Sequence, residues 1–204
     1  MHKLLFFLIL VSGTTLAQPT WDYQENVEYL ANGDPSRIWL ADGRKVEVIY
    51  EPIPWEEVDS WAEGKPLILG YRTGVGTLLH DPKTGKEIPV LSGLAQHPLD
   101  RILDQCLEEN WTTLGMIECY GATHARWDAE LNAHYERLMN TLSPRQQALL
   151  RQSQKAWIAF KDAQLVSIHA IYDRDGTIWR VVQAQQAMKV TKEQAQRLNS
   201  FSGF

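Results

Sequence analysis

Three pairs of ionisable residues have the i,i+4 spacing that places both side chains on one face of a helix. These pairs are His124 with Asp128, Glu130 with His134, and His169 with Asp173; Asp173 and Asp175 form a fourth, closer pair. Two such ligands can begin a metal site. No third ligand is supplied in sequence, and solvated helix faces often carry such pairs. We therefore expect no metal and no cofactor.

The chain offers no nucleophile next to a base. A Gly-x-Ser-x-Gly elbow is absent from the sequence. Gly70, Gly74 and Gly76 follow an expected strand, but no helix follows them and their order is not Gly-x-Gly-x-x-Gly, so a nucleotide site is not indicated. Carboxylates are plentiful, yet nothing selects a pair for glycoside hydrolysis. We therefore expect a protein that is not an enzyme.

Two strings combine polar and aromatic residues at helical spacing. They are Trp127-Asp128-x-x-Leu131-Asn132-x-x-Tyr135 and Gln154-x-x-Trp157-x-x-Phe160-Lys161-Asp162. Their polar members have two interpretations, because they could form a recognition patch between two helices or hydrogen bonds that satisfy buried indole, hydroxyl and amide groups. The structural interpretation is favoured. The polar members are Asp128, Asn132, Gln154 and Asp162.

The spacing of these strings predicts two long helices. Apolar residues that recur every three or four positions predict the first helix over residues 116–142. Ser143 and Pro144, with Gln146 after them, predict an immediate new N-terminus. Helices joined by so short a turn fold back as an antiparallel αα-hairpin. The residues expected on the inner face of the second helix are Leu149, Ala156, Trp157, Phe160 and Ala163.

The N-terminal part is predicted to be rich in β-structure. Asp42-Gly43 predicts a hairpin over residues 37–50, and the turn residues from Asp81 to Gly85 predict another, with strands over 77–80 and 87–90. A further strand is expected over 67–71, which gives about five strands. Residues 18–35 are expected to be loosely structured, with a helical turn over 26–31, and residues 55–63 to form a short amphipathic helix.

The expected fold class is α+β, with a small β-rich N-terminal unit followed by an all-α domain built on the long antiparallel αα-hairpin. We expect the β-rich unit to cover residues 18–95 and the helical domain residues 96–204. Pro98 predicts a short first helix, and helices over 178–189 and from a capping box at Thr191 to Gln194 are expected to complete the domain.

Residues 1–17 have the features of a secretory signal. Met-His-Lys precedes an apolar run from Leu4 to Val11, and Thr15 and Ala17 supply small residues before Gln18. This run is too short to span a bilayer, and no cysteine follows the expected cleavage point to carry a lipid. We expect a mature protein that is periplasmic or secreted, without a membrane anchor, from a bacterial host.

The two cysteines of the chain are expected to form a disulfide. Export places Cys106 and Cys119 in an oxidising compartment, where pairing is the usual outcome. A redox-active pair is disfavoured because a dozen residues separate them and Cys-x-x-Cys is absent.

Charge is distributed unevenly along the chain. Residues 18–95 carry 13 acidic and 7 basic side chains, whereas residues 96–204 carry 12 of each. Without a basic stripe, nucleic acid is not an expected partner. The acidic half could attract a basic partner, although excess acid also serves solubility alone.

The cysteines and the two aromatic strings together resemble the LprI-like lysozyme-inhibitor domain. The resemblance covers residues 97–200 and implies chiefly a fold; the activity that it implies is binding of a cell-wall hydrolase outside the cytoplasm. The chain departs from the family where many members carry a second cysteine pair. Leu165 and Met188 occupy those positions, and we expect them to touch.

The resemblance and the compartment favour a binding protein that blocks a lysozyme or another peptidoglycan hydrolase. The alternatives are a periplasmic immunity or adaptor protein for a secreted toxin, and a structural module without a hydrolase target. A rigid loop that fills a cleft loses little entropy on docking. Candidate contacts are Lys83 and Lys86 at one hairpin tip, and Asp173 and Asp175 in a later loop.

Overall fold

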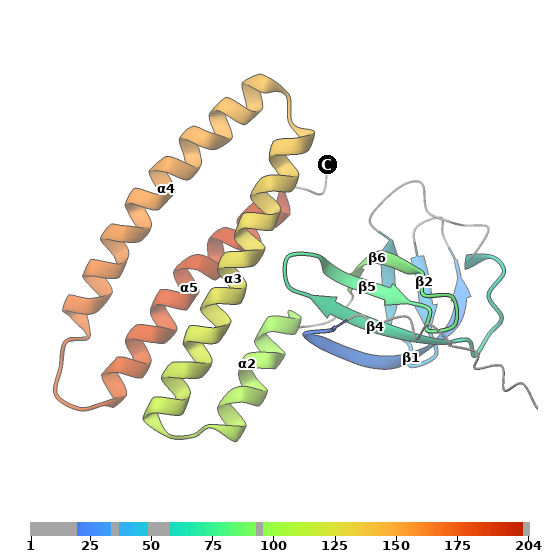
Figure 1. Cartoon of the computed structure of the whole chain (residues 1–204), viewed down its shortest axis with the longest axis horizontal. Coiled ribbons are helices and arrows are strands. Elements are labelled where there is room, and N and C mark those ends of the chain that lie inside the picture. Colours follow the sequence, from blue (N-terminus) through green and yellow to red (C-terminus); the bar gives the residue numbers. More distant parts are fainter. Residues whose placement is uncertain (1–19, 34–36, 49–57, 93–95, 202–204) are drawn as a thin grey trace, which may run out of the picture.

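The computed structural model describes residues 20–33, 37–48, 58–92 and 96–201. A β-barrel and a set of long helices lie side by side along the longest axis of the molecule (Figure 1). This arrangement confirms the predicted α+β class, with the β-rich unit before the helices. The expected signal, residues 1–17, lies outside the described residues. Among the described helices, none combines the length and the hydropathy that a transmembrane span needs.

Six antiparallel strands close the barrel in the order β1-β2-β3-β6-β5-β4. Their bounds are β1 Tyr23–Asn32, β2 Arg37–Leu40, β3 Lys45–Val48, β4 Pro66–Arg72, β5 Gly76–His80 and β6 Glu87–Ser92. The two predicted hairpins are confirmed as β2–β3 and β5–β6. Their turns need residues that accept positive φ, and Gly43 and Gly85 supply φ values of 87° and 74°.

Strand β1 corrects the prediction of a loose segment with a helical turn over residues 26–31. Val27 and Tyr29 are buried while their neighbours Asn26, Glu28 and Leu30 are exposed, so the burial alternates as in a strand. The first part of β1 pairs with β4 and its end pairs with β2, after a shift in register between Tyr29 and Ala31. A single bent strand therefore closes the barrel, and the described residues form six strands where about five were expected.

The barrel core also holds side chains from the segment predicted as a short helix. Val58 is fully buried, and Trp61 packs edge-on against Tyr29 at 5.4 Å between ring centroids. The first part of that predicted helix, residues 55–57, lies outside the described residues.

Four helices follow the barrel, and their bounds are α2 Pro98–Glu109, α3 Thr113–Thr141, α4 Pro144–Ile171 and α5 Ile178–Ser200. The predicted N-terminus at Ser143 is confirmed, because its backbone N–H donates to Gln146 Oε1 at 3.0 Å. The expected break before Thr191 is wrong, since α5 is continuous. Thr191 is buried, and its hydroxyl shares a hydrogen bond of 2.8 Å with His124 on α3.

The helices α3 and α4 form the predicted hairpin, but α3 packs mainly against α5 (Figure 1). The inner face predicted for α4 is wrong in part: Leu149 and Phe160 are 59% and 54% exposed, whereas Leu150 and Gln154 are buried. Because α5 returns along α3, it occupies the side of α3 that the predicted hairpin assigns to α4. Trp157 alone of the predicted aliphatic and aromatic set packs against the helical core.

The core of the helical part lies between α2, α3 and α5. Trp127, Leu131 and Leu138 of α3 are buried, as their spacing predicts. Met188 also lies in this core, but Leu165 is half-buried and is not among the described side chains that pack against it, so their expected contact is not supported.

The predicted disulfide is confirmed. Cys106 near the end of α2 bonds to Cys119 in the first turns of α3, at a sequence separation of 13. Cys119 is buried in the helical core. The bond therefore fixes the turn that reverses the chain between these two helices.

Replacing both Cys106 and Cys119 with alanine should lower the free energy of unfolding by about 3 kcal/mol, because the cross-link restricts a loop of this length in the unfolded chain. Urea titration followed by circular dichroism measures the change. Reduction of the unmodified protein should give a similar loss. Equal stability of the oxidised protein and the alanine variant would contradict a stabilising role for this bond.

Candidate functional site

The most buried charged side chain of the helical part lies where α3 meets the barrel. Glu130 is 3% exposed. Its Oε1 accepts hydrogen bonds from the Tyr71 hydroxyl at the end of β4 and, at 2.8 Å, from the backbone N–H of Gly74 in the following turn. A buried carboxylate is stable only with such donors. Glu130 therefore joins the helices to the barrel.

His134 lies one turn further along α3 and completes this cluster. Its Nε2 is 3.3 Å from Glu130 Oε2, and its Nδ1 accepts from Arg137 at 3.2 Å, so the neutral ring donates through Nε2. Burial, with Arg137 acting in the same direction, lowers the pKa of His134 to about 4. The pair that could have begun a metal site is thus used as a structural contact. Among the described residues no three His, Cys, Asp or Glu side chains are grouped to hold a metal.

A ladder of rings crosses the same junction. The ring of Tyr71 lies 5.4 Å from that of His97, which lies 4.5 Å from that of Trp127 on α3. His97 caps α2, because its Nδ1 accepts from the Leu99 N–H at 3.2 Å. Burial lowers the pKa of His97, which keeps Nδ1 free of a proton for this bond.

The ladder ends on a cation from α5. Lys192 Nζ lies 5.4 Å from the centroid of the Trp127 ring, and it binds both carboxylate oxygens of Asp100 on α2 at 2.6 and 2.7 Å. The junction therefore collects side chains from β4, α2, α3 and α5.

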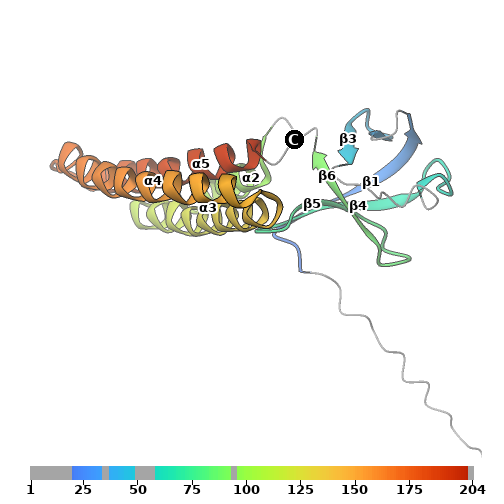
Figure 2. The ribbon, with the colours of Figure 1, turned by 90° about the horizontal axis from the view of Figure 1, so that it is seen from above.

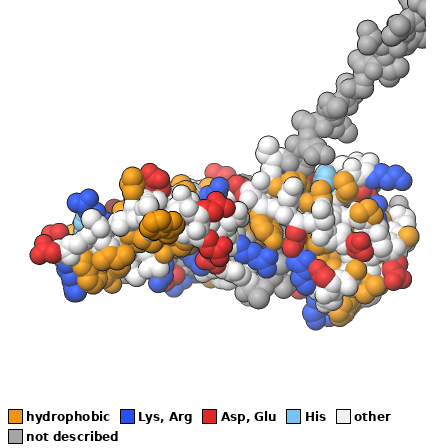
Figure 3. All heavy atoms as spheres, turned by 90° about the horizontal axis from the view of Figure 1, so that it is seen from below, with side chains coloured by type: hydrophobic (Ala, Val, Ile, Leu, Met, Phe, Trp, Pro, Cys, Tyr) orange, Lys and Arg blue, Asp and Glu red, His pale blue; other side chains and the backbone are white. Residues whose placement is uncertain are grey.

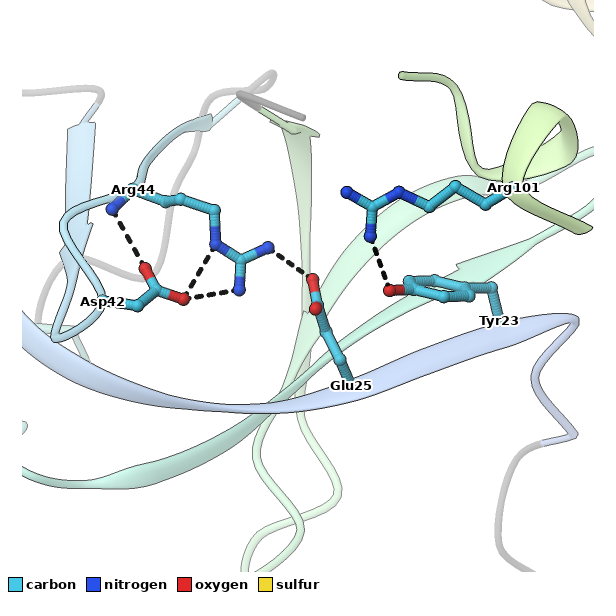
Figure 4. Close-up of polar contacts among 5 residues, drawn as sticks. All are labelled: Tyr23, Glu25, Asp42, Arg44 and Arg101. Carbon is cyan, nitrogen blue, oxygen red and sulfur yellow. Dashed lines mark hydrogen bonds and ion pairs between the residues drawn. The ribbon is translucent and has the colours of Figure 1, made fainter. Parts of the chain in front are cut away.

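Strand β1 adds polar contacts at the edge of the junction (Figure 4). The Tyr23 hydroxyl accepts from Arg101 of α2 at 2.8 Å, and two residues later Glu25 accepts from Arg44 at 2.5 Å. Arg44 also donates to Asp42 in the β2–β3 turn. Strand β1, which closes the barrel, therefore also contacts helix α2.

The structure separates the members of the two aromatic strings. Trp127 and Leu131 are buried on α3, Tyr135 is half-buried, and Gln154 and Trp157 face the core from α4. Asp128 and Asn132 are exposed and bond to each other along α3 at 3.3 Å, while Phe160 and Asp162 are exposed on α4. Among the described residues, the bonds that cross from α3 to α5 come from other positions, Tyr120 with Gln185 and His124 with Thr191.

The tip of the β5–β6 hairpin is a fixed turn that projects from the barrel away from the helices (Figure 2). Asp81, 2% exposed, accepts from the Lys83 N–H at 2.8 Å, the Thr84 hydroxyl at 2.9 Å and Lys65 Nζ at 2.8 Å. Burial alone raises the pKa of Asp81, but the bonds from Lys65 and the turn outweigh it and lower the pKa to about 2. The exposed residues 82–86, including Lys83 and Lys86, therefore stand on an anchored base.

The loop between α4 and α5 carries Asp173 and Asp175, both exposed. They border an open depression of about 420 Å³, on whose wall the rings of Tyr172 and Trp179 stack 6.0 Å apart. Arg174 lies 4.8 Å from the Trp179 ring centroid. The structure therefore places these two candidate residues at a polar depression, far along the chain from the hairpin tip and on a different element.

Apolar side chains gather on the outer surface of the helical part (Figure 3). Of the α4 side chains, Leu149, Ile158, Phe160, Val166 and Ile171 are each 49% to 71% exposed. Sequence analysis missed this surface, because the same periodicity that marks an interface also marks a core face.

Protonation of His134 should destabilise the protein. Its pKa in the folded state, about 4, is below the ordinary 6.5, so the unfolded chain binds the proton more tightly and the free energy of unfolding decreases as pH falls from 6.5 towards 4. His134→Gln should flatten this part of the curve. Urea unfolding at several pH values measures the slope. The exposed His169→Gln is the matched control, and an unaltered slope in His134→Gln would contradict the assignment.

Comparison with known proteins finds a similar family and a similar solved structure. The family model described as "Lysozyme inhibitor LprI" matches residues 106–198. No curated protein is significantly similar to the chain. A crystal structure of an uncharacterised protein from Burkholderia thailandensis is 25% identical, with a TM-score of 0.49, over 52% of this chain and 54% of that protein, about half the length of each. The matched residues run from Cys106, through the buried Trp127 and Glu130, to Leu198 of α5, and the helical half of this chain is therefore similar to the LprI family over these residues.

Proposed function

We propose that the protein is exported and that it binds and blocks a lysozyme or a related peptidoglycan hydrolase. The family that the helical half resembles is named for lysozyme inhibition, and this supports a binding role in place of catalysis. The secretory pattern in residues 1–17 supports a periplasmic or secreted location, where such hydrolases act.

The observation that carries the proposal is the anchored tip of the β5–β6 hairpin. Three hydrogen bonds and ion pairs hold Asp81 beneath the tip, so residues 82–86 lose little conformational freedom on binding. Lys83 at this tip carries a positive charge into solvent. A lysine ammonium group that enters a glycosidase cleft meets the paired carboxylates of hydrolysis. The tip therefore has the rigidity and the charge of a plug.

The contacts of Glu130 also support this role. It fixes the barrel on α3 through Tyr71 and Gly74, so the barrel does not move freely when the tip is inserted. The tip points away from the helices, which leaves it accessible to a large partner (Figure 2).

The alternative role is that of a periplasmic immunity or adaptor protein for a secreted toxin. The open depression beside the Trp179 ring favours it, because polar and aromatic groups at such a surface suit a protein partner. Capture of periplasmic and culture-fluid proteins on the immobilised full chain, followed by a muramidase inhibition assay, distinguishes these roles. Retention of a wall hydrolase with loss of its activity supports inhibition, and retention of a non-hydrolytic toxin supports the alternative.

Replacing Lys83 and Lys86 with glutamate should weaken inhibition of a muramidase roughly 30-fold or more, because reversing a desolvated charge pair costs several kcal/mol. Inhibition constants measured by turbidity of cell-wall suspensions test this. The matched control is Lys189→Glu with Arg197→Glu, which makes the same charge change on exposed α5 positions.

Unchanged inhibition by the Lys83/Lys86 variant would remove the hairpin tip as the plug. Asp173→Asn with Asp175→Asn then tests the other loop, and a loss confined to that variant would move the contact to the α4–α5 turn.

A further inference from the structure

The turn between α2 and α3 carries the most exposed of the large apolar side chains that the structure describes. Trp111 is 80% exposed, and Leu114, three residues later, is 67% exposed. Tryptophan is enriched where proteins meet, because its ring buries a large apolar area and its indole N–H can donate a hydrogen bond. Apolar side chains that stand singly on a surface are common, so the surroundings of Trp111 decide whether it marks a contact.

The turn itself is held in one conformation. The disulfide closes it, and the backbone and side-chain N–H groups of Asn110 both donate to the carbonyl oxygen of Cys106 at 2.9 Å. On the other side of Trp111, the Thr112 hydroxyl accepts from the Gly115 N–H at 3.1 Å. A Cβ atom at position 115 would lie 2.8 Å from the Cβ of Asn110, so this close approach requires glycine. Because the backbone on both sides is fixed, Trp111 loses little conformational entropy when a partner docks.

A second turn extends the apolar surface. The hydroxyl oxygens of Thr113 and Thr177 lie 3.4 Å apart, so α3 and α5 begin next to each other, at the lower end of the helices in Figure 1. Ile178, which follows Thr177, is 52% exposed. Trp111, Leu114 and Ile178 thus lie at one end of the helical part, and we call them the Trp111 surface.

The chain around the Trp111 surface is acidic. Between Arg101 and Arg126 it contains no lysine or arginine. The acidic side chains in this interval are all exposed, and none forms an ion pair among the residues that the structure describes; they are Asp104, Glu108, Glu109 and Glu118. Residues 163–187, which contain the α4–α5 loop, carry two acidic and two basic side chains, which cancel. The net charge of these two segments is therefore −4, with histidine counted as neutral.

We propose that the Trp111 surface binds a protein partner through a basic amphipathic segment, in which apolar side chains are flanked by lysine or arginine. The exposed aromatic and aliphatic groups meet the apolar side chains of such a segment, and the surrounding carboxylates attract its cations. The same carboxylates repel anionic lipid and a second copy of this surface. The contact lies on the helices, apart from the β5–β6 hairpin tip, and does not depend on the binding of a hydrolase.

Binding of a synthetic peptide to the full oxidised chain tests the proposal. The probe is a fluorescently labelled helical peptide of about three heptads, with leucine on one face and lysine on the other. Its anisotropy should show saturable binding with a Kd below about 100 µM, and Trp111→Ser should weaken this binding roughly 10-fold or more. The same peptide with glutamate in place of lysine should not bind. Absence of saturable binding of the lysine peptide up to about 100 µM would overturn the proposal.

A second exposed tryptophan supplies the matched control. Trp39 of β2 is 38% exposed on the barrel, so Trp39→Ser should leave binding of the lysine peptide unchanged. Circular dichroism should show the same helix content for the unmodified chain and both serine variants. Equal weakening by both variants would show that the peptide binds any exposed tryptophan, and would overturn the proposal.

Removal of local charge tests the role of the carboxylates. Glu108→Gln with Glu118→Gln should weaken peptide binding roughly 5-fold at low ionic strength and should reduce its dependence on salt. Asp162→Asn with Glu193→Gln removes the same charge from exposed positions outside the two segments, and should have little effect. Equal weakening by both double variants would show that the net charge of the whole chain holds the peptide, which contradicts a local site.

Sedimentation with phosphatidylcholine vesicles separates a protein partner from a membrane, because this lipid carries no net charge that the carboxylates would repel. The unmodified chain should stay in the supernatant. Sedimentation that Trp111→Ser abolishes would assign the Trp111 surface to lipid and overturn the proposal.

Discussion

Burial of the Glu130 carboxylate is the constraint on which the arrangement of this molecule depends. A carboxylate removed from water is tolerated only if donors satisfy it, and two of its donors, Tyr71 and the Gly74 N–H, come from the barrel. Movement of the barrel away from α3 would remove both donors of Glu130 Oε1. The ring ladder through His97 and Trp127, and the Lys192–Asp100 pair beyond it, extend this one contact across α2 and α5. The helical half and the barrel are therefore held in one orientation.

Features that depend on local chemistry could be predicted from the sequence. Asp42-Gly43 marks its hairpin because only certain residues accept positive φ, and Ser143-Pro144 marks a helix start because its cap is contiguous in sequence. The buried face of α3 follows from the spacing of Trp127 and Leu131. Strand β1 was missed because its polar outward residues hide the alternation of Val27 and Tyr29, and because the bend that lets it pair with two strands has no local signal.

Long-range contacts account for the rest of what sequence reasoning missed. The spacing of Glu130 and His134 shows that they share a face, but not that Tyr71, 59 positions earlier, faces them. The tip residues Lys83 and Lys86 were identified from turn chemistry, whereas the anchoring of Asp81 by Lys65 depends on the folded barrel. On α4 the predicted inner face was wrong for Leu149 and Phe160, because the periodicity could not show that α5 would take the place against α3 and leave Phe160 in solvent.

Because the junction is fixed, the hairpin tip and α4 keep a constant separation and orientation relative to each other. Hydrogen exchange followed by mass spectrometry at increasing urea measures this coupling directly, on peptides that contain residues 67–71 of β4 and 127–131 of α3. If the barrel and the helical half open as one unit, both segments should have the same free energy of opening, within about 1 kcal/mol. Opening of the barrel segment alone, at a free energy lower by more than about 2 kcal/mol, would show that Glu130 does not hold the two halves together.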